Sequence, residues 1–188
     1  MRVGITAKDI IDTKGSHEIC DYADAIFEAL YDTKTQERVA KEVFIETLPE
    51  PLQVAVLLND FLTADTLEEA IQHITIEETD PGRALFYQEK IVWALQQIGK
   101  ADIAGLVKDA IRQYEEEKKL TQPITSALSA IDPHDSVLYD PFATYIRNHV
   151  DTIVTKEYTE KIEAIMHGPA KNTKEYTAKI KKYPWLRM

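Results

Sequence analysis

Apolar residues recur every three or four positions along most of the chain, which is the spacing of one face of an α-helix. No clean stretch alternates apolar and polar residues as a half-buried strand does. The prolines fall between the periodic stretches and mark where they end. The pattern predicts an all-α protein, a compact bundle of about seven to nine helices with no significant sheet.

Capping signals and proline breaks position the first three predicted helices. Ser16 is a good N-cap for the first helix. Thr33 and Gln36 have the spacing of a capping box for a second helix over about 35–47. The next helix, over 52–62, is apolar on nearly all sides, so we expect it to be central and buried.

Similar signals delimit the later helices. Thr66 and Glu69 form a capping-box pattern that opens a short helix. Asp80 and the proline after it start a longer helix, which Gly99 ends as a C-terminal cap. Periodic apolar residues predict further helices over about 103–117, 124–131 and 136–153, and a last one that carries Tyr158 and ends at Gly168.

These segments divide the chain into a helical domain over 1–167 and a C-terminal tail over 168–188. The tail is basic, and its lysines alternate with tyrosines and a tryptophan. Such interleaving can bind nucleic acid. We favour a tail docked on the body, because Trp185 and Leu186 are costly to leave in water.

Composition limits the compartment and the chemistry. The single cysteine, Cys20, cannot form an internal disulfide, and its acidic neighbours disfavour a reactive thiolate. The N-terminal residues contain no apolar stretch of secretory length. The longest purely apolar run, 54–58, is far too short to span a bilayer. We therefore expect a cytoplasmic protein without membrane association.

The net charge of −10 is unevenly distributed. Residues 151–188 hold eight lysines and arginines against five acids, so the negative excess belongs to residues 1–150. An acidic body repels nucleic acid and favours a basic protein partner. The plainer interpretation is that the charge only keeps the protein soluble.

The acidity is concentrated on one side of the first predicted helix. At about 100° per residue, its carboxylates occupy roughly a third of the circumference, opposite the apolar side. Exposed helix faces usually mix charges, since like charges three or four residues apart repel. A row of negative charge can imitate the phosphates of DNA. The candidate partner-binding residues are Glu18, Asp21, Asp24, Glu28 and Asp32.

Catalytic and metal-binding patterns are weak. The chain contains no nucleophile elbow and no phosphate-binding glycine loop. Glu69, His73 and Glu77 share the i, i+4, i+8 spacing of one helix face and could ligate zinc or iron, but a solvated face explains them better. His149 follows Tyr145 at helical spacing, as a core or boundary histidine does. We expect no catalytic residues, no metal and no cofactor.

The middle of the chain resembles a known family. Residues 94–101, Ala-Leu-Gln-Gln-Ile-Gly-Lys-Ala, continued by the apolar positions of 103–111, are similar to a helix–Gly–helix segment of a bacterial family of DNA-mimic proteins, whose helical domain was formerly of unknown function. Residues 138–149 are similar to the closing helix of that domain, and the resemblance covers about 43–154. The Asn-Gly-Gly-Phe element of the family is absent; 58–62 read Leu-Asn-Asp-Phe-Leu.

The resemblance implies an all-α fold and a non-enzymatic binding role, since a member of the family is described as an acidic dimer that imitates DNA and sequesters a DNA-binding protein. The leading hypothesis is an acidic protein-binding module, in one version such a DNA mimic. An immunity-type or regulatory protein that caps one toxin or enzyme is the second hypothesis, and a metal-dependent helical enzyme is the third. The sequence leaves open whether the chain forms a homodimer.

Overall fold

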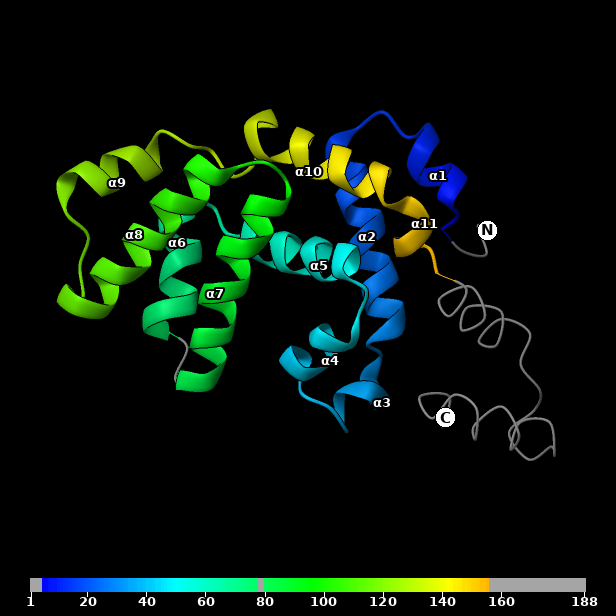
Figure 1. Ribbon diagram of the computed structural model, residues 1–188, viewed down its shortest axis with the longest axis horizontal. Coiled ribbons are helices and arrows are strands. Elements are labelled where there is room, and N and C mark those ends of the chain that lie inside the picture. The colour runs from blue at the N-terminus through cyan, green and yellow to red at the C-terminus, as the bar shows by residue number, and fades with distance from the viewer. Residues whose placement is uncertain (1–4, 78–79, 156–188) are drawn as a thin grey trace.

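The computed structural model describes residues 5–77 and 80–155, and all regular structure within them is helical (Figure 1). The all-α prediction is confirmed. The predicted helix that carries Tyr158 and the tail over 168–188 lie outside the described residues. The helices are α1 (Ala7–Asp12), α2 (Ser16–Leu30), α3 (Thr33–Gln36), α4 (Lys41–Thr47), α5 (Glu50–Leu62), α6 (Leu67–Gln72), the π-helical turn η1 (His73–Glu77), α7 (Pro81–Gln97), α8 (Ala101–Glu117), α9 (Gln122–Ser129), α10 (Ser136–Asn148) and α11 (Val150–Ile153).

Helix α5 is the centre of the fold, as its apolar sequence predicts. It crosses the middle of the molecule between α2 and α7 and also packs against α4, α6, α10 and α11 (Figure 1). Neighbours on so many sides explain why this helix has no polar stripe. Its buried residues are Leu52, Val54, Ala55, Val56, Leu57, Leu58, Phe61 and Leu62.

The other helices pair on either side of α5. On one side α2 packs against α10, and α1 packs against α11 (Figure 1). On the other side α7 and α8 form an antiparallel pair, and α6 and α9 pack against α8 and against each other (Figure 1). None of the described helices is long and apolar enough to cross a membrane.

The start of α2 differs from the prediction. A separate helix, α1, precedes it; Thr6 and Asp9 close a capping box there, with the Asp9 carboxylate accepting from the Thr6 amide at 2.9 Å. Gly15, not Ser16, is the N-cap of α2 and makes no side-chain cap. The Ser16 hydroxyl instead donates to Asp140 of α10 at 2.6 Å. The Ser16 side chain, which the local pattern assigned to a cap, therefore makes a tertiary contact instead.

The predicted helix over 35–47 is two helices, α3 and α4. Asp32 caps α3, since its carboxylate accepts from the amide and the hydroxyl of Thr35 at 3.1 and 2.9 Å. Helix α3 thus begins at Thr33, whose side chain lies outside the described part of the structure. Between the two helices, the Tyr31 hydroxyl donates to the Val39 carbonyl at 2.9 Å. This bond satisfies a carbonyl where the helical hydrogen bonding stops.

Other predicted helix ends are confirmed. The Thr66 hydroxyl accepts from the Glu69 amide at 3.1 Å, although the Glu69 carboxylate bonds the amide of Asp65 rather than that of Thr66. Asp80 accepts from two amides in the first turn of α7.

The predicted helix over 136–153 differs from the structure: it is interrupted at His149, which separates α10 from α11.

Gly99 ends α7 through backbone geometry that favours glycine. Its φ is +78°, in the left-handed region. The Gly99 amide donates to the Gln96 carbonyl at 3.0 Å, and the Lys100 amide donates to the Leu95 carbonyl at 2.9 Å. These two bonds form a Schellman motif, which satisfies carbonyls at the end of the helix and turns the chain into α8.

Two glycine substitutions should shift stability in opposite directions. Gly99→Ala should destabilise the fold by about 1 kcal/mol, because a Cβ disfavours a positive φ. Gly105→Ala should stabilise it by about 0.5–1 kcal/mol, because Gly105 lies inside α8 with open space for a Cβ. Urea unfolding of both variants measures the difference. A stabilising Gly99→Ala would contradict the assigned role of this turn.

Candidate functional site

Four of the five predicted acidic contacts lie along the outward side of α2, and Asp32 follows the end of that helix. The opposite side of α2 faces the core through Ile19, Cys20, Ala23, Ile26, Phe27 and Leu30. Glu18, Asp21 and Glu28 are exposed, whereas Asp24 and Asp32 are half-buried. The helical spacing thus placed four of the five opposite the buried side of α2, but it did not distinguish the exposed three from Asp24.

We define the acidic face as the exposed carboxylates Glu18, Asp21 and Glu28. Over 5–77 and 80–155, no lysine or arginine forms an ion pair with any of them. Glu18 accepts a hydrogen bond from the Tyr22 hydroxyl at 2.7 Å. At 1.5 Å of rise per residue the face is about 15 Å long. Exposed Ala25 lies between these carboxylates, so a partner could approach the helix closely.

The two half-buried acids have internal contacts. Asp32 caps α3 as described above, and this structural role accounts for its half-buried position. Asp24 lies near Asp60 of α5: burial raises the pKa of the Asp24 carboxyl above its usual value, and the charge of Asp60 raises it further. A hydrogen bond from Asn59 and the charge of Lys41 oppose this shift of the Asp24 pKa without cancelling it.

Beside Asp24, Lys41 links α4 to α5 and α2. Its ammonium group lies 2.6 Å from the Asp60 carboxylate and 5.3 Å from the centre of the Phe27 ring. An ion pair combined with a cation–π contact fixes the lysine side chain better than either contact alone. The first residue of α4 is thereby attached to the two helices beneath it.

The next residue, Glu42, attaches α4 to α7. Its carboxylate is 12% exposed and accepts from Arg83 Nε at 2.7 Å and from the Tyr87 hydroxyl at 3.2 Å. Burial by itself would raise the pKa of Glu42, but a backbone hydrogen bond and Arg83 outweigh it and hold the pKa below its usual value. Burial and the Glu42 charge raise the pKa of Tyr87.

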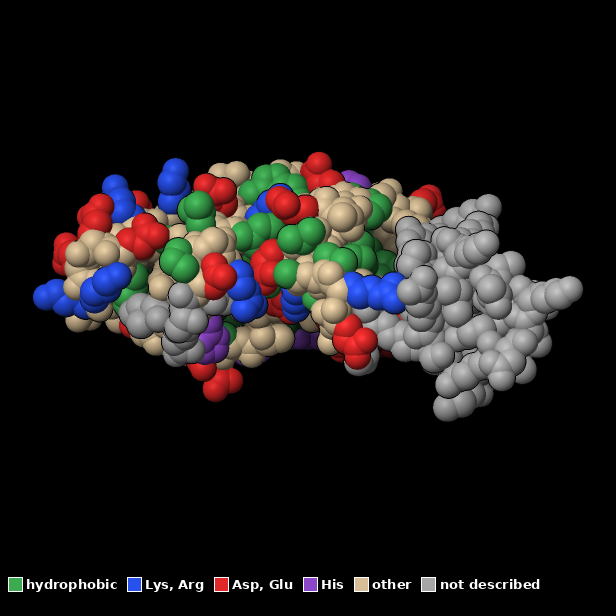
Figure 2. Space-filling model, turned by 90° about the horizontal axis from the view of Figure 1, so that it is seen from below, with side chains coloured by type: hydrophobic (Ala, Val, Ile, Leu, Met, Phe, Trp, Pro, Cys, Tyr) green, Lys and Arg blue, Asp and Glu red, His purple; other side chains and the backbone are tan. Residues whose placement is uncertain are grey.

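A cavity of about 220 Å³ opens where α5, α6, η1 and α7 meet. Both signs of charge occur at its edge, and its other side chains are mostly apolar. Figure 2, which views the molecule from the side of α3, α4 and the start of α7, shows acidic, basic and apolar side chains intermingled on this face. The lining residues are Asp60, Phe61, Ala64, Ala70, His73, Ile74, Arg83, Tyr87 and Ile91.

The residues considered for metal binding lie where α6 passes into the π-helical turn η1. His73 Nε2 lies 3.9 Å from Glu69 Oε1, but residues 73–77 form the π-helical turn η1, whose bonds run i to i+5. The Glu77 side chain lies outside the described part of the structure, so this ligand set stays a prediction. Among the side chains that the structure describes, no three of His, Cys, Asp or Glu gather as metal ligands do.

Two other candidate side chains have structural surroundings. Cys20 is buried; burial chiefly, with some help from Asp21, raises the pKa of its thiol, and Arg147 opposes the shift. The acidic neighbours thus act in the predicted direction, but burial dominates. His149 is half-buried, with Nδ1 2.8 Å from the Tyr145 carbonyl oxygen and its ring 4.3 Å from the Tyr145 ring.

Sequence reasoning missed the charged contacts around the cavity. Glu42 and Arg83 lie 41 positions apart, and Lys41 and Asp60 lie 19 apart, so no helical spacing rule relates them. The one signal was that Lys41 and Glu42 form an adjacent pair of opposite charge. The fold alone decides which side chain each of them meets.

No protein-family model, curated protein or solved structure matches this chain. The resemblance of residues 43–154 to the DNA-mimic family therefore stays a prediction. What can be said of function rests on the acidic face and on the cavity.

Removing the Glu42 charge should destabilise the fold in a pH-dependent way. Because the folded-state pKa of Glu42 is lowered, its contribution is present above the ordinary glutamate pKa of about 4.3 and is lost as pH falls through the folded-state value. Glu42→Gln should cost about 1–3 kcal/mol at pH 7 and progressively less towards pH 3. Urea unfolding between pH 3 and 7 measures this.

The matched control for this variant is Glu46→Gln in the same helix. Glu46 is 57% exposed and its carboxylate lies 3.7 Å from Lys90, so its replacement should change stability by less than about 0.5 kcal/mol. Equal losses in the two variants would contradict the role given to Glu42.

Asp24→Asn should have the opposite effect. A carboxyl whose folded-state pKa is raised destabilises the fold when charged, so stability falls as pH rises from the usual aspartate value through the folded-state value. The variant should therefore unfold at a higher urea concentration than the original protein at pH 7, and the gain should vanish below about pH 4. Asp21→Asn, at an exposed position of the same helix, is the control.

Proposed function

We propose that this protein is a non-enzymatic binding module whose acidic face, Glu18, Asp21 and Glu28 of α2, binds a basic surface of another protein. In one version of the proposal the partner is a DNA-binding protein, and the acidic face takes the place of DNA. We further infer a cytoplasmic location, because a lone buried cysteine needs no oxidising compartment.

The observation that carries the proposal is that the acidic face lacks ion-pair partners among the described residues. Some carboxylates elsewhere in the described residues do pair with a cation: Lys41 meets Asp60, Arg83 meets Glu42 and Lys90 meets Glu46. Along α2 each acid is followed by another three or four residues later, a spacing that costs a few tenths of a kcal/mol per pair. A basic partner would relieve that repulsion.

The charge density of α2 supports the DNA-mimic version. On the acidic face three carboxylates span about 15 Å of helix, or one charge in about 7.5 Å. One strand of duplex DNA carries a phosphate in about 3.4 Å of axis. The two densities are of the same order, so a row of lysines and arginines that follows a DNA strand could also follow this helix.

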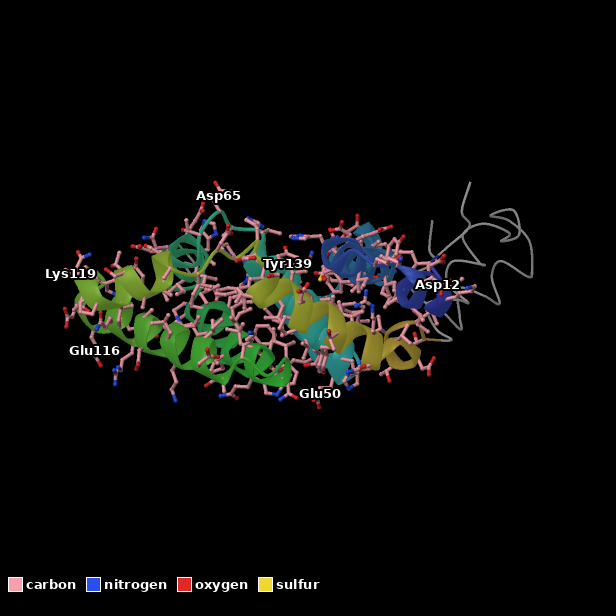
Figure 3. All side chains as sticks on the ribbon, turned by 90° about the horizontal axis from the view of Figure 1, so that it is seen from above. Asp12, Glu50, Asp65, Glu116, Lys119 and Tyr139 are labelled. Carbon is pink, nitrogen blue, oxygen red and sulfur yellow. The ribbon has the colours of Figure 1, made fainter. Side chains whose placement is uncertain are left out.

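Reversing two charges should abolish partner binding. Asp21→Lys with Glu28→Lys should remove capture of the partner from native lysate at 50 mM salt, because the face would then repel a basic surface. The control is Glu116→Lys with Glu117→Lys. It changes the net charge equally at the exposed end of α8, remote from α2 (Figure 3). Affinity capture on the tagged protein, with quantitative mass spectrometry, compares the variants.

Added salt and added duplex DNA then distinguish a DNA-binding partner from a toxin or enzyme. Captured protein should be released by 300 mM salt, because exposed charges are screened at that ionic strength. Added duplex DNA should compete if the partner is a DNA-binding protein, and should have no effect if the partner is a toxin or enzyme that this chain caps. Undiminished capture by the double variant at Asp21 and Glu28 would refute the proposed role of the acidic face.

A further inference from the structure

The cavity between α5, α6, η1 and α7 presents one positive and one negative group from different helices. Arg83 of α7 and Asp60 of α5 both line it. Their ion-pair partners, Glu42 and Lys41, do not line it. Each charged group at the cavity edge is therefore held by a partner outside the cavity.

Both supporting residues belong to the first turn of α4. Lys41 contacts Asp60 at 2.6 Å, and Glu42 accepts from Arg83 Nε at 2.7 Å. Lys41 and Glu42 are half-buried and adjacent in sequence, so one helix turn fixes the separation of Asp60 and Arg83. Side chains restrained in this way lose little further freedom when they bind a ligand.

The inner part of the cavity is apolar and small. Phe61, Ala64, Ala70 and Ile91 are each at most 9% exposed. The volume of about 220 Å³ has room for roughly seven water molecules and falls below the usual 300–1,000 Å³ of pockets for drug-sized ligands. An occupant must therefore be small, with an apolar part that displaces water from these side chains.

Another polar residue that lines the cavity, His73, lies in the irregular turn η1. The Gln88 side chain donates to the Ile74 carbonyl at 3.1 Å, and the Thr75 hydroxyl donates to the Ile71 carbonyl at 2.6 Å. These bonds give the Ile71 and Ile74 carbonyls side-chain donors where the α-helical hydrogen bonding is interrupted. Single π-helical turns of this kind occur often at functional sites.

We propose that this cavity binds a free amino acid with an apolar side chain. The carboxylate of the ligand pairs with Arg83 and is near His73, its ammonium group pairs with Asp60, and its side chain packs on Phe61 and Ile91. Fixed charges of both signs beside an apolar floor match a small zwitterion better than they match a simple acid or amine. The cavity is separate from the acidic face, so this inference does not depend on the proposed function.

The direct test is a titration of the full-length protein with L-leucine. Binding is measured during the titration by calorimetry and by NMR of the backbone amides. We expect saturable binding with a Kd between micromolar and millimolar, as suits a ligand of this size. Two analogues test the charges: 4-methylpentanoate lacks the ammonium group and 3-methylbutylamine lacks the carboxylate. Each should bind at least about tenfold more weakly.

Variants locate the binding. Asp60→Asn should weaken leucine binding about tenfold or more. Asp65→Asn is the same chemical change a few residues away, at a side chain that projects from the body (Figure 3), and should leave binding unchanged. Ala64→Leu should fill the cavity and abolish binding while circular dichroism shows an intact helical fold.

Several results would overturn the proposal. They are the absence of saturable leucine binding at 10 mM, binding of either analogue as strong as that of leucine, and equal losses in Asp60→Asn and Asp65→Asn. Because the analogues are tested on the unaltered protein, the outcome stands even if a variant fails to fold.

Discussion

Burial of α5 on nearly every side is the constraint on which the rest of the structure depends. A helix without a polar stripe is stable only when other helices cover it, and here α2, α7, α10 and α11 supply most of that cover. Each of these helices turns its apolar side towards α5. Its polar side therefore faces solvent. The acidic face of α2 is outward because the other side of α2 faces the core.

The charged groups divide in a way that follows from this packing. Where α4 approaches α5 and α7, opposite charges pair: Lys41 with Asp60 and Glu42 with Arg83. These contacts are partly shielded from water. A charge without a partner at such a shielded position would be costly. On α2 the exposed acids Glu18, Asp21 and Glu28 are solvated and have no cation beside them among the described residues, at a small cost in repulsion. Helix α2 carries four acids and no lysine or arginine, and so accounts for part of the net charge of −10.

The two proposals draw on these two arrangements. A solvated row of like charge suits a large, complementary and salt-sensitive protein contact. Paired charges around a small apolar cavity suit a small ligand that carries both signs. Asp60 lies between the two regions, since it lines the cavity and also raises the pKa of Asp24 on α2.

The sequence by itself determined the helical class, the central position of 52–62 and the helix ends at Asp80 and Gly99, because periodicity and capping are local properties. It also placed the acids of α2 on one side of that helix. Only the tertiary structure decided that Ser16 bonds Asp140, that Asp24 is half-buried beside Asp60, and that Glu42 meets Arg83. These contacts join residues on different helices, and no spacing along the chain encodes how packed helices bring their side chains together.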